Sequence, residues 1–284
     1  MLKAMRDSDS PARARFAAIA ALPDERIDVA EAALWVAAEA QPRIDVGAYR
    51  GKLVAVAGRA SRRVAAARGI ADRVAKLARF LHDEERLRGN EADYYDPRNS
   101  FLSDVLDRGL GIPITLSIVW VDVARRLGLE AAGVGFPGHF LVQVASDDGS
   151  ELLVDPFHGR LVDLSDCEAL LARAAGPRAR VDIGMLRPAA PREILMRLLR
   201  NLKHAHAQRD EFAAAVACCD RLLLLQPDDP IELRDRGLLL RGEGAWTPAV
   251  ADLEHYLARV PAAADGAEIR ALIAALRQQI ARLN

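Results

Sequence analysis

Two residues near the middle of the chain, His139 and Asp155, are of the types that serve as a general base and as the carboxylate that orients it. His139 opens one predicted strand and Asp155 ends the next, so neighbouring strands of one sheet would bring the two side chains together. An imidazole held by a carboxylate activates a nucleophile by taking its proton. The same pair would equally serve as a structural hydrogen bond between two strands, and the sequence leaves both interpretations open.

Two hydroxyls precede His139, on the predicted helix before it: Thr115 and Ser117. A hydroxyl attacks only when a base lies within hydrogen-bond reach, so the start of the helix would have to bring it to His139. A hydroxyl inside an apolar helix more often bonds a carbonyl one turn earlier. We therefore keep Thr115 and Ser117 as candidates to line a cleft, with a local structural role as the favoured interpretation.

The chain has three cysteines, and none is a strong candidate for a nucleophile. Cys167 falls at the predicted start of a helix, which lowers a thiol pKa, but the acidic residue beside it has the opposite effect. Cys218 and Cys219 are adjacent within a predicted helix and are interpreted as packing residues. Three such cysteines form no disulfide framework, which favours a reducing, cytoplasmic location.

The sequence predicts no metal site and no organic cofactor. Asp155 and His158, with His139, would offer ligands of mixed oxygen and nitrogen type, but a compact motif such as His-Glu-x-x-His is absent. A turn at Asp155-Pro156 followed by a surface histidine is the favoured interpretation. The chain also lacks a Gly-x-Gly-x-x-Gly or phosphate-loop sequence.

The polar segment of residues 93–100 is the next candidate for the site. Asn99 would contact a ligand or the loop that carries His139, and Ser100 would line the same cleft. Local structure also explains these residues, because Asn99 or Ser100 is placed to cap a helix predicted over residues 101–108. The local role is the favoured one.

The elements that must position these residues are helices followed by strands. Residues 13–81 have the apolar spacing of three or four amphipathic helices. A helix over residues 113–127 is apolar nearly all round, as in a domain interior, and Pro113 fits its first turn because that amide would lack an intrahelical partner. Strand-like runs follow at residues 132–135, 140–145, 152–155 and 160–162. The predicted fold class is α+β, a helix packed on a small antiparallel sheet.

The C-terminal third is helical and repetitive. Pro227 and Pro261 lie 34 residues apart, and this period, with small residues where two helices cross, is the tetratricopeptide pattern. At one small-residue position the second copy has Gly237 and the first has Lys203, so the first copy is the weaker match. A last helix over residues 268–283 would cover the exposed face of the final repeat.

The composition of the 284 residues argues against several classes of partner. With 39 basic and 40 acidic residues, the net charge of −1 gives no global attraction for nucleic acid or anionic lipid. The apolar runs are too short to span a bilayer, so membrane insertion is not expected, and the first fifteen residues lack the apolar centre of a signal peptide. Repeats of this kind favour a protein or peptide partner, and their arginines would suit an acidic one, although neighbouring acids partly cancel that charge.

Four motifs, in this order, resemble those of the bacterial SirB-type proteins, which join a transglutaminase-like core to a C-terminal tetratricopeptide segment. The motifs are Asp93-Tyr94-Tyr95-Asp96-Pro97-Arg98-Asn99-Ser100, Gly111-Ile112-Pro113-Ile114, Gly135-Phe136-Pro137-Gly138-His139-Phe140 and Val154-Asp155-Pro156-Phe157. The resemblance covers residues 30–284 and implies a papain-like core, a helix on an antiparallel sheet, with helices before it.

The resemblance also implies which residue is missing. In papain-like and transglutaminase-like sites, a thiolate at a helix N-terminus is activated by a strand histidine that a carboxylate on the next strand orients. The histidine and carboxylate positions fall on His139 and Asp155, and the Gly-x-Cys that opens the central helix falls on Gly111-Ile112-Pro113. Proline has no nucleophilic atom, so the residue that would form the covalent bond is absent.

We expect three parts: residues 1–88 form the N-terminal helical part of the core domain, residues 89–187 the transglutaminase-like core and residues 191–284 the repeats. The expected function is that of a pseudoenzyme, a non-catalytic or catalytically altered transglutaminase-like protein that acts as a protein-binding regulatory or adaptor module. The alternative is a hydrolase or acyl transferase that uses His139 and Asp155 with a non-cysteine nucleophile.

Overall fold

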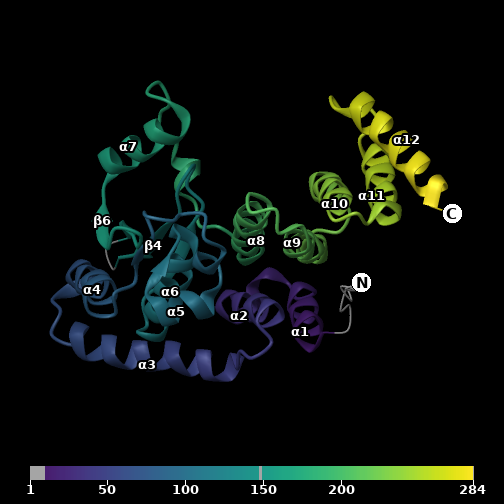
Figure 1. The fold of residues 1–284 in the computed structure, drawn as a ribbon. Helices are drawn as coiled ribbons and strands as arrows, with labels where there is room; N and C mark the ends of the chain where they lie inside the picture. The colour runs from purple at the N-terminus through teal and green to yellow at the C-terminus, as the bar shows by residue number, and fades with distance from the viewer. Residues whose placement is uncertain (1–9, 147–148, 284) are drawn as a thin grey trace. The chain divides into compact units, whose positions relative to one another are not determined.

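The computed structural model describes residues 10–146 and 149–283 (Figure 1). The chain divides into two compact units after Leu198, which we call the core unit and the repeat unit. The division falls inside helix α8 (Pro191–Ala207), whereas the sequence suggested that the repeats begin at residue 191. The start of α8 belongs to the core unit because Ile194 and Leu198 are buried in its hydrophobic core.

Four helices begin the core unit, within the segment where three or four were expected: α1 (Pro11–Ala20), α2 (Val29–Ala40), α3 (Val46–Val64) and α4 (Gly69–Arg79). Side chains fix two of their starts, because Asp28 accepts a hydrogen bond from the main-chain N–H of Glu31 in α2, and Asp45 from that of Ala48 in α3. Short turns precede α2 and follow α4: the 3-10 turn η1 (Asp24–Arg26) and the π-helical turn η2 (Phe80–Glu84).

The next segment contains short elements around the start of the central helix. They are β1 (Arg88–Gly89), the 3-10 turn η3 (Pro97–Asn99), α5 (Leu102–Arg108) and β2 (Leu110–Gly111). β1 and β2 pair in parallel, and two-residue strands leave no periodicity by which a sequence would reveal them. Gly89 lets β1 pack closely against Phe157, because a Cβ at Gly89 would lie 2.3 Å from the Phe157 ring.

The central helix α6 (Pro113–Arg126) packs on an antiparallel sheet, which confirms the predicted α+β class. The sheet has the strand order β3 (Ala131–Val134), β4 (Leu141–Ala145), β5 (Glu151–Asp155) and β6 (Arg160–Val162). Val142 and Val144 of β4 pack into the core that contains α6. The alternate residue Leu141 packs with α7 (Leu164–Ala175), so the two helices lie on opposite faces of the sheet. A 3-10 turn, η4 (Ile183–Leu186), precedes α8.

The repeat unit contains the end of α8 and the helices α9 (Phe212–Leu225), α10 (Pro230–Gly242), α11 (Trp246–Arg259) and α12 (Gly266–Leu283). Gly237 lets α10 and α11 pack closely, because a Cβ there would lie 2.7 Å from Cγ of Leu253. At the equivalent position of the first copy, the Lys203 ammonium bonds the carboxylates of Glu232 at 2.6 Å and Asp235 at 2.7 Å. Lys203, which departs from the repeat pattern, therefore forms an ion-pair cluster with these two acidic residues.

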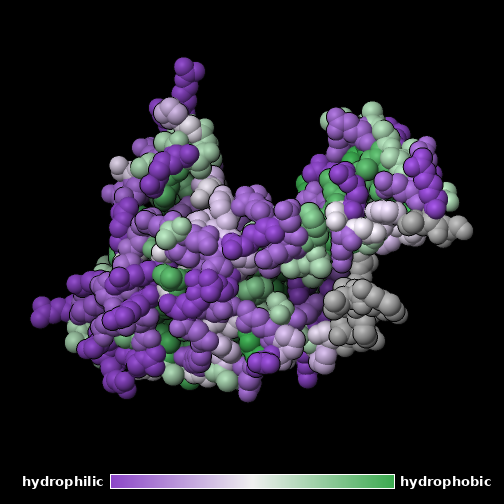
Figure 2. All heavy atoms as spheres, viewed as in Figure 1, coloured by the Kyte–Doolittle hydropathy of each residue, from purple (hydrophilic) through white to green (hydrophobic). Residues whose placement is uncertain are grey.

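The described helices include none that combines the length and apolar character needed to cross a bilayer. On the face drawn in Figure 2, hydrophilic residues cover most of the core unit, and apolar residues lie among them as small areas.

Candidate functional site

His139 follows a tight turn that leads into β4. Gly138 in this turn has a φ of +69°, and a Cβ on it would lie 2.5 Å from that of Ala174, so both conformation and space require glycine. The main-chain N–H of His139 donates to the carbonyl of Phe136 at 3.1 Å. From α8, Nη2 of Arg197 donates to the carbonyls of Phe136 at 3.0 Å and His139 at 2.6 Å. The turn that carries the histidine is thus held on both sides.

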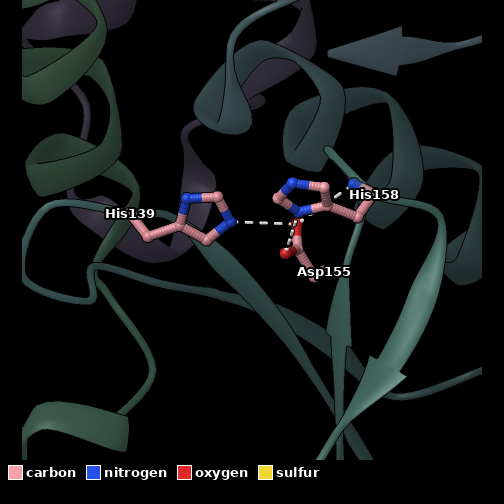
Figure 3. Close-up of side chains that lie close together, drawn as sticks. All are labelled: His139, Asp155 and His158. Atoms are coloured by element: carbon pink, nitrogen blue, oxygen red, sulfur yellow. Dashed lines mark hydrogen bonds and ion pairs between the residues drawn. The ribbon is translucent and has the colours of Figure 1, made fainter. Parts of the chain in front are cut away.

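The structure brings the two residues of the predicted pair together. Nε2 of His139 lies 2.9 Å from Oδ1 of Asp155, the last residue of β5 (Figure 3). The His139 side chain is 9% exposed and that of Asp155 is 1% exposed, so little water competes for this hydrogen bond. In the described part of the chain, His139 bonds no further side chain, which leaves Nδ1 as the ring nitrogen for another group.

A second histidine, His158, shares the carboxylate. Its Nδ1 lies 2.7 Å from Oδ2 of Asp155, and the rings of His139 and His158 are stacked with centroids 6.1 Å apart. The sequence predicted a surface histidine; the side chain is 38% exposed and also bonded to Asp155. The contact with Asp155 was not predicted, and the spacing of three residues within a turn was the signal that could have revealed it.

Asp155 is ionised at neutral pH. Burial would raise the pKa of its carboxyl, but the hydrogen bonds and charges of His139 and His158 outweigh burial and lower that pKa to about 2. Oδ1 also accepts the main-chain N–H of Phe157 at 3.0 Å. A fixed carboxylate of this kind holds the His139 imidazole in one orientation.

Thr115 is fully buried, and its hydroxyl is engaged locally. Oγ1 accepts the main-chain N–H of Ile112 at 3.1 Å and lies 2.8 Å from the carbonyl of Asn99 and 3.0 Å from that of Ile112. The hydroxyl therefore closes the first turn of α6 and joins it to residue 99. The contact with Ile112 is the local role that the sequence favoured. The contact with the carbonyl of residue 99 was not predicted.

Ser117 lies elsewhere in the core unit. Its hydroxyl is buried and has no hydrogen-bond partner in the described part of the chain. The residue lines a cavity of about 480 Å³ together with Gly133 and Phe140, and His139 is not among the described residues of that lining. No contact in the described structure therefore brings the Ser117 hydroxyl to the imidazole.

Asn99 organises the polar loop before α5. Its Nδ2 donates to the carbonyls of Asp93 at 2.7 Å and Tyr94 at 3.2 Å, and its Oδ1 accepts from Asn90 at 3.0 Å. Neither Asn99 nor Ser100 caps α5, whose N-cap is Phe101 without a side-chain cap, so that prediction was wrong. The Asn99 amide is occupied by the loop, and Ser100 is buried with 3% exposure.

Aromatic rings lie beside the histidine pair, and they were not predicted as site residues. Phe157 lies edge-on to His139 with centroids 6.0 Å apart, and Tyr94 lies 6.3 Å from Phe157. Tyr94 and Tyr95 are 39% and 49% exposed. Their position within the first of the four motifs was the available signal. Arg197 was also missed as a site residue, because its contact with the turn joins residues far apart in sequence.

The remaining candidates are poorly suited to nucleophilic attack. Pro113 is buried in the first turn of α6, as expected. Cys167 is buried in α7, and burial, reinforced by Asp166 and Asp163, raises the pKa of its thiol. Burial likewise raises the pKa of Cys219. Buried thiols with raised pKa values are poor nucleophiles at neutral pH.

One group in the described residues has the composition of a metal site. His139, Asp155 and His158 each offer a ligand atom, and the three atoms lie within 4.8 Å of one another.

Comparison with known proteins agrees with this architecture. Residues 47–200 match the model of the transglutaminase-like superfamily, and residues 202–274 match a tetratricopeptide repeat model. A UPF0162 protein of Xylella fastidiosa strain Temecula1 is 38% identical over 249 residues, covering 86% of this chain and 88% of its own length. A UPF0162 protein of Pseudomonas aeruginosa is 33% identical, covering 75% and 77%.

The protein SirB1 of Salmonella typhimurium is 29% identical over 161 residues, covering 57% of this chain and 60% of its own length. No solved structure matches the chain. The family matches agree with the helix-on-sheet core and the C-terminal helix pairs described above. The chain therefore belongs to the transglutaminase-like superfamily, among its SirB-type proteins with C-terminal tetratricopeptide repeats.

Proposed function

We propose that this chain is a pseudoenzyme of the transglutaminase-like superfamily that binds a polypeptide partner as a regulatory or adaptor module. The observation that carries the proposal is a histidine–carboxylate pair without an attacking group: Pro113 opens the central helix, and the Thr115 hydroxyl is bonded to Asn99. A general base cannot begin acyl transfer without a nucleophile.

The surroundings of His139 support binding of an extended peptide. The free Nδ1 of His139 offers a polar contact, and the exposed rings of Tyr94 and Tyr95 offer apolar area with hydroxyls at the edge. Tyrosine is enriched in protein interfaces because it supplies both kinds of contact at low entropic cost.

The repeats support the same proposal, since tetratricopeptide repeats generally hold peptides or proteins. Their basic residues are largely paired within the repeat unit: Arg200 and Lys203 with Glu232, Arg234 with Asp265, and Arg236 with Asp220 and Asp252. Little positive charge is therefore left to select an acidic peptide, and shape and apolar contacts carry the recognition.

A hydrolase or acyl transferase is the second candidate. It is favoured by one observation, the ionised Asp155 that orients His139 with Nδ1 free. That reaction would need an attacking atom from outside the pair, and this is why binding is the preferred proposal.

Affinity capture tests the binding proposal. The full chain, a form truncated after Ala207 and a Tyr94→Ala/Tyr95→Ala form would serve as baits in a lysate of the native cell, followed by quantitative mass spectrometry. Truncation after residue 207 keeps Ile194 and Leu198, which the core unit buries. We expect a defined partner on the full chain and at least about tenfold less of it on each variant, a loss of one or more hot-spot contacts.

An exposed residue outside the site provides the control, because Ile183 is 86% exposed. The Ile183→Ala bait should recover the partner at the level of the full chain. Equal recovery on all four baits would overturn the proposal.

A further inference from the structure

We propose that His139, Asp155 and His158 form a binding site for a divalent transition-metal ion with the ligand preferences of zinc. This site goes beyond partner binding and does not depend on it.

The donor atoms suit such an ion. Two imidazole nitrogens and one carboxylate oxygen make a set that zinc and other borderline ions accept, and catalytic zinc sites often have three protein ligands of this kind. Figure 3 shows the imidazole rings of both histidines next to the Asp155 carboxylate, and dashed lines mark their hydrogen bonds to it. The separations are 2.9 Å for His139 and 2.7 Å for His158, and all three ligand atoms lie within 4.8 Å of one another.

The geometry needs only a small adjustment. An ion with bonds of about 2.0–2.2 Å holds neighbouring tetrahedral ligands roughly 3.4 Å apart. Because the three ligand atoms lie within 4.8 Å of one another, no two of them need to approach by more than roughly 1.4 Å. His158 is the residue that can move, because its side chain is 38% exposed, whereas those of His139 and Asp155 are 9% and 1% exposed. As the ion binds, the proton between each ring and the carboxylate moves to the other nitrogen of that ring.

Groups around the three ligands hold them in place. Oδ1 of Asp155 accepts the main-chain N–H groups of Phe157 at 3.0 Å and His158 at 3.4 Å. Arg197 fixes the carbonyl of His139 at 2.6 Å. Such outer contacts orient ligands and raise the affinity of metal sites.

The surrounding charge permits a cation. Asp155 supplies one negative charge, and Glu91 lies 3.9 Å from Nε2 of His158 on the exposed side of the site. Arg160, the adjacent cation on β6, is paired with Asp166 at 2.8 Å. The exposed side of His158 leaves a coordination position for water, as in zinc sites that are not closed by a fourth side chain.

The test uses the full chain, first stripped of metal, and two probes: Co²⁺ followed by visible absorption and Zn²⁺ followed by calorimetry. We expect one ion per chain with the spectrum of nitrogen and oxygen ligands. His158→Ala and Asp155→Asn should each weaken binding at least about 100-fold, since even loss of an outer contact costs 10- to 100-fold.

A matched control is present in the repeat unit, because His255 lies 3.6 Å from Asp228 but belongs to no group of three ligands in the described structure. His255→Ala should bind both ions like the unmodified chain. Circular dichroism would check folding, and the half-exposed His158 makes His158→Ala informative even if Asp155→Asn unfolds.

Three results would overturn the proposal: no stoichiometric uptake of either ion, equal binding in His158→Ala and the unmodified chain, or a thiolate-to-cobalt charge-transfer band, which would assign the ion to cysteine. Partner capture with and without chelator reads out the binding function separately.

Discussion

At the scale of single residues, Asp155 is the most constrained group of the site. Its two oxygens accept from both histidines and from the main chain, and the carboxylate has 1% exposure. A buried charge with this many partners is costly to disturb, because removing the charge leaves its donors without an ionic acceptor.

Asp155→Asn should therefore lower the free energy of unfolding of the core unit by about 2 kcal/mol, the value of hydrogen bonds to a buried charge. Urea unfolding at neutral pH would be followed by tryptophan fluorescence in a Trp246→Phe background. Trp35 and Trp120 then report on the core unit alone.

Asp83→Asn is the matched control, since the Asp83 side chain is 60% exposed in its pair with His82. It should leave the free energy of unfolding nearly unchanged, because an exposed pair is screened by solvent. Equal losses of unfolding free energy in the two variants would mean that burial of Asp155 and its contacts with two histidines do not contribute to stability.

Residue types and order predicted the His139–Asp155 contact, because the nucleophile, base and carboxylate positions follow the chain order of a known fold. The full set of contacts of the Thr115 hydroxyl was harder to predict, since one of its acceptors is the carbonyl of Asn99, sixteen residues away. Arg197 was beyond prediction for the same reason: its acceptors at residues 136 and 139 are 61 and 58 residues away.

At the scale of elements, α8 holds the turn that presents His139. Replacing the Arg197 guanidinium by an ammonium removes the geometry that reaches two carbonyls at once. In Arg197→Lys, the amide of His139 should exchange about tenfold faster with deuterium, which corresponds to about 1.4 kcal/mol, the strength of one charged hydrogen bond.

The control for this exchange experiment is Arg200→Lys, one turn further along α8. Arg200 bonds Glu232 of the repeat unit instead of the turn. Its substitution should leave exchange at His139 unchanged, and equal acceleration in both variants would contradict a local role for Arg197.

The close packing of α10 on α11 gives a second prediction for the elements. In Gly237→Ala, the added methyl would lie 2.7 Å from Leu253, so overpacking should destabilise the repeat unit by about 1–3 kcal/mol. Hydrogen exchange of the α10 and α11 amides would measure this loss.

Gly58→Ala serves as the opposite case, at an exposed position of α3. A Cβ at Gly58 meets nothing within 4 Å, so alanine should stabilise α3 by up to about 1 kcal/mol. If both substitutions changed stability in the same direction, the close packing of α10 on α11 would not explain why residue 237 is glycine.

Periodicity predicted the long elements well. The strand runs were found within one residue of β3 to β6, because alternation persists over three or more residues. Periodicity could not reveal β1 and β2, which are two residues long, or the division of the chain inside α8, where helical sequence is continuous.

At the scale of the whole molecule, the chain combines a transglutaminase-like core with tetratricopeptide repeats, and the four motifs together with the 34-residue period predicted that combination. The function is harder to predict from the sequence than the fold, because it depends on whether a nucleophile replaces the cysteine sulfur at the position of Pro113. The proposed function rests on two observations, that His139 is bonded to Asp155 and that Pro113 opens α6, and it predicts that the site binds a partner without forming a covalent bond.

Covalent labelling resolved by peptide mass spectrometry tests this claim most directly. The unmodified chain, Pro113→Cys and Pro113→Cys/His139→Ala would be treated with iodoacetamide, which alkylates thiolates, and with a fluorophosphonate, which phosphonylates activated hydroxyls with loss of fluoride. We predict no label on residues 111–117 of the unmodified chain and rapid alkylation at position 113 in Pro113→Cys, slowed in the double variant because the thiolate loses its base. A label on Thr115 or Ser117 of the unmodified chain that His139→Ala abolishes would contradict the account.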